Sequence, residues 1–209
     1  MSIRPTTFAT YYLDQDRTHN DVNEITDITE QADPQQKQWA TPVWSARGNM
    51  TTIPKPKDLD ETLTATYDAW NRLVEVKDGE TTIQKNIYDA LGRRVKKHVD
   101  SQAPGAPDGV DTYQHMYYNT SWQLIETRET DTESTAPDTL VPEYQFVWST
   151  RYIDSPILRD DFTAYGVMDG RIYYLTDANM NVTAVVNTAG TVVERYVYDP
   201  YGKAIIYNQ

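Results

Sequence analysis

The sequence predicts an all-β fold in which antiparallel β-hairpin repeats form one curved, strongly twisted sheet. Two observations favour this fold. A nine-residue pattern recurs along the chain and combines strand-forming with turn-forming residues. No window has the periodicity of a long amphipathic helix, and a short helix fits only near residues 29–38. We therefore expect about six hairpins, one for each copy of the pattern.

Six copies of the pattern begin at residues 44, 67, 88, 118, 176 and 198. The clearest copies occupy 67–75, 88–96 and 118–126. Intervals of 23, 21 and 22 residues separate three neighbouring pairs of copies, which is room for two short strands and two turns. The two longer intervals must contain insertions. The dipeptide Asp78-Gly79 predicts a further hairpin turn between copies.

Each column of the pattern has a structural interpretation. Asp, Asn or Ser at the second position predicts a cap that accepts hydrogen bonds from backbone N–H groups two or three residues later. Gly or Asn at the fifth position of four copies predicts a residue with positive φ. Apolar or β-branched residues then restart a strand. The predicted structural motif residues are Tyr67, Asp68, Asn71, Arg72, Tyr88, Asp89, Gly92, Arg93, Tyr118, Asn119, Asp177, Tyr198, Asp199 and Gly202.

The chain divides into a weakly patterned N-terminal segment, 1–40, and a repeat sheet, 41–209. Within the sheet, segments 101–111 and 130–138 predict loops because they are polar or rich in Pro and Gly. Segment 53–58 is interrupted by two prolines and is also expected to be a loop.

Composition excludes several classes of function. A net charge of −12 argues against binding to nucleic acid or to an anionic membrane surface. The chain has no Cys, which rules out disulfides, thiolate zinc sites and a cysteine nucleophile. No apolar run approaches the length of about 20 residues that a membrane span requires. The first seven residues lack the apolar region of a signal peptide.

No catalytic or metal-binding motif stands out. His19, His98 and His115 are scattered, and the sequence has no HExxH, GxSxG, P-loop or GxGxxG motif. The acidic pairs Asp58/Asp60 and Asp160/Asp161 favour solvated loops over calcium sites, because no EF-hand loop is present. We expect neither an enzyme nor a cofactor. Exposed Tyr and Trp rings could stack on sugars, so a carbohydrate-binding module is the alternative.

The repeats resemble the Rhs/YD-repeat protein family. The resemblance is carried by Tyr67-Asp68-Ala69-Trp70-Asn71-Arg72-Leu73 and by Tyr88-Asp89-Ala90-Leu91-Gly92-Arg93-Arg94. Segments 146–154, 175–186 and 192–202 reinforce it, and 140–209 resembles the start of the family's repeat-associated core. The resemblance covers most of the chain.

This resemblance implies a segment of a partial β-shell, wound as a spiral, that in complete relatives encapsulates and delivers a C-terminal toxin. The expected function is a non-catalytic structural scaffold. The expected partners are neighbouring YD repeats and the toxin cargo, and the expected location is secreted or at the cell surface. The alternative is a cell-surface carbohydrate-binding or adhesion module. Exposed sheet edges also predict self-association of the isolated chain.

The end of the sequence bears on this expectation. Asp199-Pro200-Tyr201-Gly202 superficially resembles the family's autoproteolytic aspartate motif. Its alignment with the other copies favours a structural turn instead. Because no toxin domain follows before Gln209, we expect a partial shell, a gene remnant or one part of a split protein.

Overall fold

The computed structural model describes residues 15–30, 38–56, 58–102, 106–133, 140–200 and 202–208. These residues form β-strands and no helix, so the predicted all-β fold is confirmed. Accordingly, no described helix could cross a membrane. The strands are β1 (Gln15–His19), β2 (Ile25–Glu30), β3 (Val43–Trp44), β4 (Met50–Lys55), β5 (Asp58–Tyr67), β6 (Leu73–Asp78), β7 (Thr81–Tyr88), β8 (Arg94–Val99), β9 (Thr112–Tyr118), β10 (Leu124–Thr130), β11 (Val141–Trp148), β12 (Pro156–Phe162), β13 (Met168–Thr176), β14 (Val182–Asn187), β15 (Val192–Tyr198) and β16 (Ala204–Asn208).

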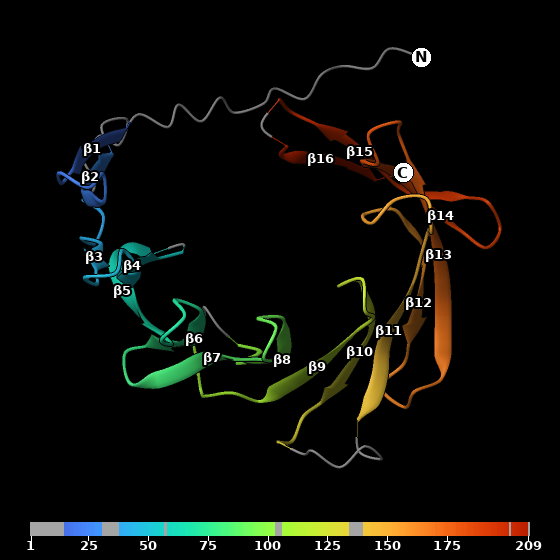
Figure 1. Cartoon of the computed structure of the whole chain (residues 1–209), viewed down its shortest axis with the longest axis horizontal. Coiled ribbons are helices and arrows are strands. Elements are labelled where there is room, and N and C mark those ends of the chain that lie inside the picture. Colours follow the sequence, from blue (N-terminus) through green and yellow to red (C-terminus); the bar gives the residue numbers. More distant parts are fainter. Residues whose placement is uncertain are drawn as a thin grey trace. The chain divides into compact units, whose positions relative to one another are not determined.

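The order of strands in the sheet follows the order of the sequence. Strands β1 and β2 form a hairpin, and β3 to β16 form one antiparallel sheet in which each strand neighbours the strands before and after it (Figure 1). Most strand pairs contain a shift of register, as between Thr66 and Tyr67 in the β5–β6 pair. Such bulges increase the local twist of a strand.

The chain forms two compact units. The first comprises residues 1–85 and 102–109, and its core is a cluster of Leu63, Val76 and Ile83. These residues come from the neighbouring strands β5, β6 and β7. They can pack together because alternate side chains of a strand point to the same face of the sheet. The Trp44 indole N–H donates to the Ile25 carbonyl (2.8 Å) and so joins the β1–β2 hairpin to β3.

The prediction of a loop at 53–58 is wrong for 53–55 and 58, whereas Pro56 lies in a turn and residue 57 is outside the described residues. Strand β4 continues to Lys55 and β5 begins at Asp58. Pro54 is tolerated because β3 pairs only with Met50 and Thr52, which leaves Pro54 paired on one side, with Thr62 of β5. Proline lacks an N–H donor and is accepted at such local edges.

The second unit comprises residues 86–101 and 110–209 and contains β8 to β16. Few of its apolar side chains are buried; among the described residues of this unit they are Met116, Leu140 and Val185. Its buried polar residues are more numerous: Asn86, His98, Asp100, His115, Thr127, Ser155 and Asp160. Polar residues therefore outnumber apolar ones among the buried residues described in this unit.

Parts of the remaining expectations fall on residues that the structure does not describe. Of the segment expected to allow a short helix, Thr29 and Glu30 belong to β2, Gln38 makes an isolated bridge with Thr29, and 31–37 lie outside the described residues. The described parts of the two predicted loops, 101–102, 106–111 and 131–133, are not strands, whereas Thr130 ends β10. The division at residue 40 stays a prediction.

Candidate functional site: the capped turns and the faces of the sheet

The predicted motif residues occupy equivalent places in successive hairpins. The four tyrosines end the strand that precedes a turn, and the next residue opens the turn: Tyr67 and Asp68, Tyr88 and Asp89, Tyr118 and Asn119, Tyr198 and Asp199. Asp177 opens the turn between β13 and β14.

The turn at Asp89 shows the shared geometry. The Asp89 N–H donates to the Arg93 carbonyl (2.9 Å), and the Gly92 N–H donates to the Asp89 carbonyl (3.0 Å). Gly92 has a φ of 86°, which closes the turn without a clash because glycine has no Cβ. The same two backbone hydrogen bonds recur in the turns that open at Asp68, Asn119, Asp177 and Asp199.

The Asp89 side chain caps its own turn. Oδ1 accepts hydrogen bonds from the backbone N–H groups of Leu91 (2.9 Å) and Arg93 (3.0 Å), which are two and four residues later rather than the predicted two or three. Oδ2 accepts from the Arg93 Nε (2.7 Å). Burial opposes the charge of Asp89, but these hydrogen bonds outweigh it and hold the pKa of the carboxyl below its usual range.

Arg93 also joins its turn to the next one. Its Nη1 donates to the Asn119 carbonyl (3.3 Å), which opens the following motif turn. Its guanidinium lies over the rings of Tyr118 (5.4 Å) and Trp122 (5.6 Å). The Tyr118 hydroxyl in turn donates to the Arg94 carbonyl (3.0 Å). Motif residues of adjacent hairpins therefore form a ladder of turns along one edge of the sheet.

Other copies build the ladder from different side chains. In the first unit, the Arg72 Nε donates to the Asp68 Oδ2 (2.7 Å). Arg47 Nη1 donates to the Ala69 carbonyl of the next turn (3.1 Å). In the second unit, Gln123 accepts from the Asn119 amide (2.7 Å) and donates to the Ile153 carbonyl of the following connection (2.7 Å).

Three further turns, outside the six predicted copies of the pattern, have the same geometry. They open at Asn20, Thr163 and Asn187 and repeat the same backbone hydrogen bonds. Their side-chain oxygens cap the turn as well; Asn187 Oδ1 accepts from the N–H groups of Ala189 (3.0 Å) and Thr191 (2.9 Å). The available signal was a capping residue followed three positions later by Asn or Gly.

The backbone at the fifth position of the pattern also differs from the prediction, which expected positive φ in four copies. All six predicted copies have positive φ at this position, including Trp122 (66°) and Met180 (65°). Left-handed backbone is costly for a residue with a Cβ. The strand pairing on both sides therefore imposes the turn geometry even where the residue disfavours it.

A polar row crosses one face of the second unit. Glu126, Gln145, Asp160 and Arg171 are register partners on β10, β11, β12 and β13. Gln145 donates to Glu126 (2.7 Å), and Arg171 donates to both oxygens of Asp160 (2.6 and 2.8 Å). These bonds from Arg171 hold the pKa of Asp160 below its usual range.

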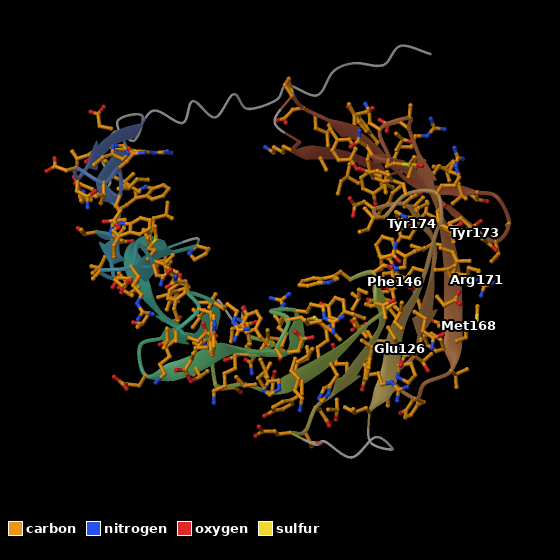
Figure 2. All side chains as sticks on the ribbon, in the orientation of Figure 1. Glu126, Phe146, Met168, Arg171, Tyr173 and Tyr174 are labelled. Atoms are coloured by element: carbon orange, nitrogen blue, oxygen red, sulfur yellow. The ribbon has the colours of Figure 1, made fainter. Side chains whose placement is uncertain are left out.

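The opposite face carries aromatic rings and a second ion pair. Arg159 donates to both oxygens of Asp161 (2.6 and 3.1 Å), and its guanidinium lies over the Tyr144 ring (4.5 Å). Figure 2 shows Phe146 and Tyr174 on the side of the sheet opposite Arg171 and Tyr173, as their alternation along β11 and β13 requires. The Asp160/Asp161 pair is thus split between two faces, each carboxylate paired with an arginine.

Two of the three histidines meet in the second unit. His98 and His115 lie on adjacent strands, and His98 packs edge-on against Tyr113 (4.7 Å). Burial, together with the charge of Lys96 and the neighbouring His98, lowers the pKa of His115. His19 belongs to the first unit and lies on the exposed β1 strand. Among the residues that the structure describes, no group of three or more His, Asp or Glu is placed to hold a metal.

Two of the most exposed aromatic rings of the second unit lie far from each other. Trp122 is 55% exposed and Tyr165 is 91% exposed. They occupy the β9–β10 and β12–β13 turns, which lie at opposite edges of the sheet because antiparallel strands reverse direction at each turn. These two rings therefore do not form one platform.

Comparison with known proteins places the fold. No family model matches the sequence, and no curated protein matches it. The crystal structure of TcdB2-TccC3-Cdc42 matches 91% of this chain with a TM-score of 0.50 and 12% identity. TcdB2-TccC3 without its hypervariable C-terminal region matches 93% with a TM-score of 0.48 and 15% identity. The Photorhabdus luminescens Tc holotoxin pore matches 93% with a TM-score of 0.44 and 13% identity.

The chain spans only 11%, 10% and 10% of the length of these three matched chains. At 12% identity, the similarity to TcdB2-TccC3-Cdc42 concerns the fold alone. TccC3 is an Rhs/YD-repeat protein, so the chain has an Rhs-like fold, as the repeat motifs predicted.

Proposed function

We propose that this chain is a non-catalytic structural scaffold, a segment of an Rhs/YD-repeat β-shell. The ladder of turns is the observation that carries this proposal. Asp89 caps its own turn, and Arg93 closes on Asp89 while reaching the Asn119 carbonyl of the next turn. Side chains engaged in this way maintain the stacking of hairpins and are not free to act on a substrate.

The sparse core supports the same proposal. Among the described residues, no large side chain is less than 2% exposed, and the apolar cluster of the first unit consists of three buried residues. Repeat architectures of this kind gain stability from contacts between neighbouring repeats. The proposed partners are therefore further YD repeats on either side of this segment.

The proposed role in the complete protein is to enclose a C-terminal toxin until delivery. It is supported by the family resemblance of the motifs and by the fold similarity to TcdB2-TccC3-Cdc42. An enclosed cargo requires a rigid wall, and the pairs Glu126–Gln145 and Asp160–Arg171 link β10 to β11 and β12 to β13 of this sheet.

Limited proteolysis of the full gene product that contains these residues tests the proposal. We expect a C-terminal segment to resist protease while the shell is intact and to become cleavable in the Asp89→Ala variant. Asp131→Ala is the matched control, because Asp131 is exposed and lies outside the capped turns. A C-terminal segment that is equally cleavable in the wild type would contradict enclosure. Saturable binding of a soluble glycan would favour the adhesion alternative.

A further inference from the structure

His115 is a buried titratable residue between two basic side chains. It is 9% exposed and lies on β9, whose neighbours in the sheet are β8 and β10 (Figure 1). It pairs in register with Lys96 of β8 and with Arg128 of β10. Residues directly opposite each other on antiparallel strands share a face, so the two basic side chains flank the imidazole. A neutral imidazole is tolerated there, whereas a protonated one adds a poorly solvated cation.

The other ionisable side chains that face His115 come from the same three strands. His98 of β8 pairs with Tyr113 of β9 and packs edge-on against its ring (4.7 Å). Tyr117 lies two residues beyond His115 on β9, opposite Glu126 of β10. Of these four side chains, Glu126 alone is anionic at neutral pH. Compensation of a charge on His115 therefore depends on what Glu126 already binds.

Glu126 is already paired with Arg128. Its Oε1 accepts a charge-assisted hydrogen bond from the Arg128 Nε, which neutralises the cation on the β10 side. On the β8 side, Lys96 is half-buried and forms no ion pair with a carboxylate of the described residues. A charge on His115 is therefore repelled mainly across the β8–β9 pair. This pair is also the shorter one, with four register partners against six for β9–β10.

We propose that the β8–β9 pair is a pH-sensitive seam, which opens when His115 is protonated and Lys96 repels it. Burial, together with the charges of Lys96 and His98, lowers the pKa of His115. The fold therefore favours the neutral imidazole. This contribution to stability is present above the unfolded pKa of about 6.5 and is lost as the pH falls through that value and below.

The opening is confined to this seam because the carboxylates that hold other parts of the second unit titrate at lower pH. Hydrogen bonds hold the pKa of Asp89 and that of Asp160 below their usual range. At about pH 5.5 both carboxylates are still ionised, so the capped turn at Asp89 and the Asp160–Arg171 pair persist. The inference is independent of the proposed shell function.

Hydrogen–deuterium exchange of the full chain, measured by mass spectrometry at about pH 7.5 and about pH 5.5, tests the seam. After correction for the intrinsic pH dependence of exchange, peptides from β8 and β9 should exchange faster at the lower pH. The increase should reach about tenfold for each unit by which the fold lowers the pKa of His115. Peptides from β12 and β13 should keep their protection. His115→Gln should remove the response, and the matched control His19→Gln, at an exposed histidine of the first unit, should retain it.

Two lysine variants test the role of repulsion across the seam. Lys96→Gln removes the cation opposite His115 and should weaken the pH response. Lys97→Gln should not, because Lys97 lies opposite Gln114 on the other face of the same strand. A titration of the His115 imidazole by NMR in the wild type covers a folding failure of the variants, and it should give a pKa below about 6.5.

Four results would overturn the proposal. They are an exchange pattern that does not change with pH, a loss of protection spread evenly over the second unit, a response that persists in His115→Gln or Lys96→Gln, and an imidazole that titrates at or above its ordinary value.

Discussion

Substitutions of Trp122 test the turn geometry. Glycine usually makes a protein less stable than alanine does, but at this position we expect the opposite. Its φ of 66° is left-handed, which costs an L-residue roughly 1–2 kcal/mol. Glycine avoids this cost. It also makes the unfolded chain more flexible, which lowers the stability of the folded protein by about 0.4–1 kcal/mol relative to alanine. We therefore expect Trp122→Gly to unfold with a free energy about 1 kcal/mol greater than Trp122→Ala. Both variants lose the stacking on Arg93, so that contribution cancels.

The comparison is measured by thermal and chemical denaturation followed by circular dichroism. A difference of about 1 kcal/mol corresponds to a Tm difference of about 2–4 °C in a chain of this size. Ser121 is the matched control, because it lies in the same turn and is not among the residues with positive φ. There, Ser121→Gly should be less stable than Ser121→Ala. If glycine is the less stable choice at both positions, Trp122 is not left-handed in solution and the reasoning fails.

Three further predictions concern the core and the pH dependence of stability. Leu63→Ala should lower the free energy of unfolding by roughly 2–3 kcal/mol, because it opens a cavity beside Val76 and Ile83; an unchanged denaturation midpoint would contradict this. The lowered pKa of His115 means that the fold favours its neutral form. Stability should thus decline as the pH falls through the unfolded pKa of about 6.5 and below, and His115→Gln should flatten that decline in a series of melts. Burial, with the charge of Glu143, raises the pKa of Glu129. The ionised carboxylate therefore opposes folding, and Glu129→Gln should raise the Tm at pH 7 but not at pH 4; equal shifts at both would refute the assignment.

The local part of this fold could be predicted from the sequence. The turn at Asp89 involves five consecutive residues, and its cap, its glycine and its arginine all lie within that window. Hairpins joined by such turns specify an antiparallel sheet in chain order, which is the topology observed. The turns that open at Thr163 and Asn187 lie outside the six predicted copies, because this turn requires only a capping residue and, three positions later, a residue with positive φ.

Features that depend on two or more hairpins could not be predicted. Pro54 lies in a strand because β3 is too short to pair with it, and the length of β3 is not encoded near Pro54. The row from Glu126 to Arg171 requires the correct register across three strand pairs. Each bulge moves the following residues to the opposite face, so one unrecognised bulge would separate these partners.

The variety of side chains in the ladder indicates how the sheet remains coherent with a small core. The cap is closed by an Asp–Arg pair at Asp89 and Arg93, but by an Asn–Gln pair at Asn119 and Gln123. In both cases the closing residue also donates to a carbonyl of the next connection, 3.3 Å and 2.7 Å away. Because each turn is held both locally and by its neighbour, stability accumulates along the chain as hairpins are added. Such a sheet can grow in length without enlarging a hydrophobic centre, which is the property that a wall made of repeats requires.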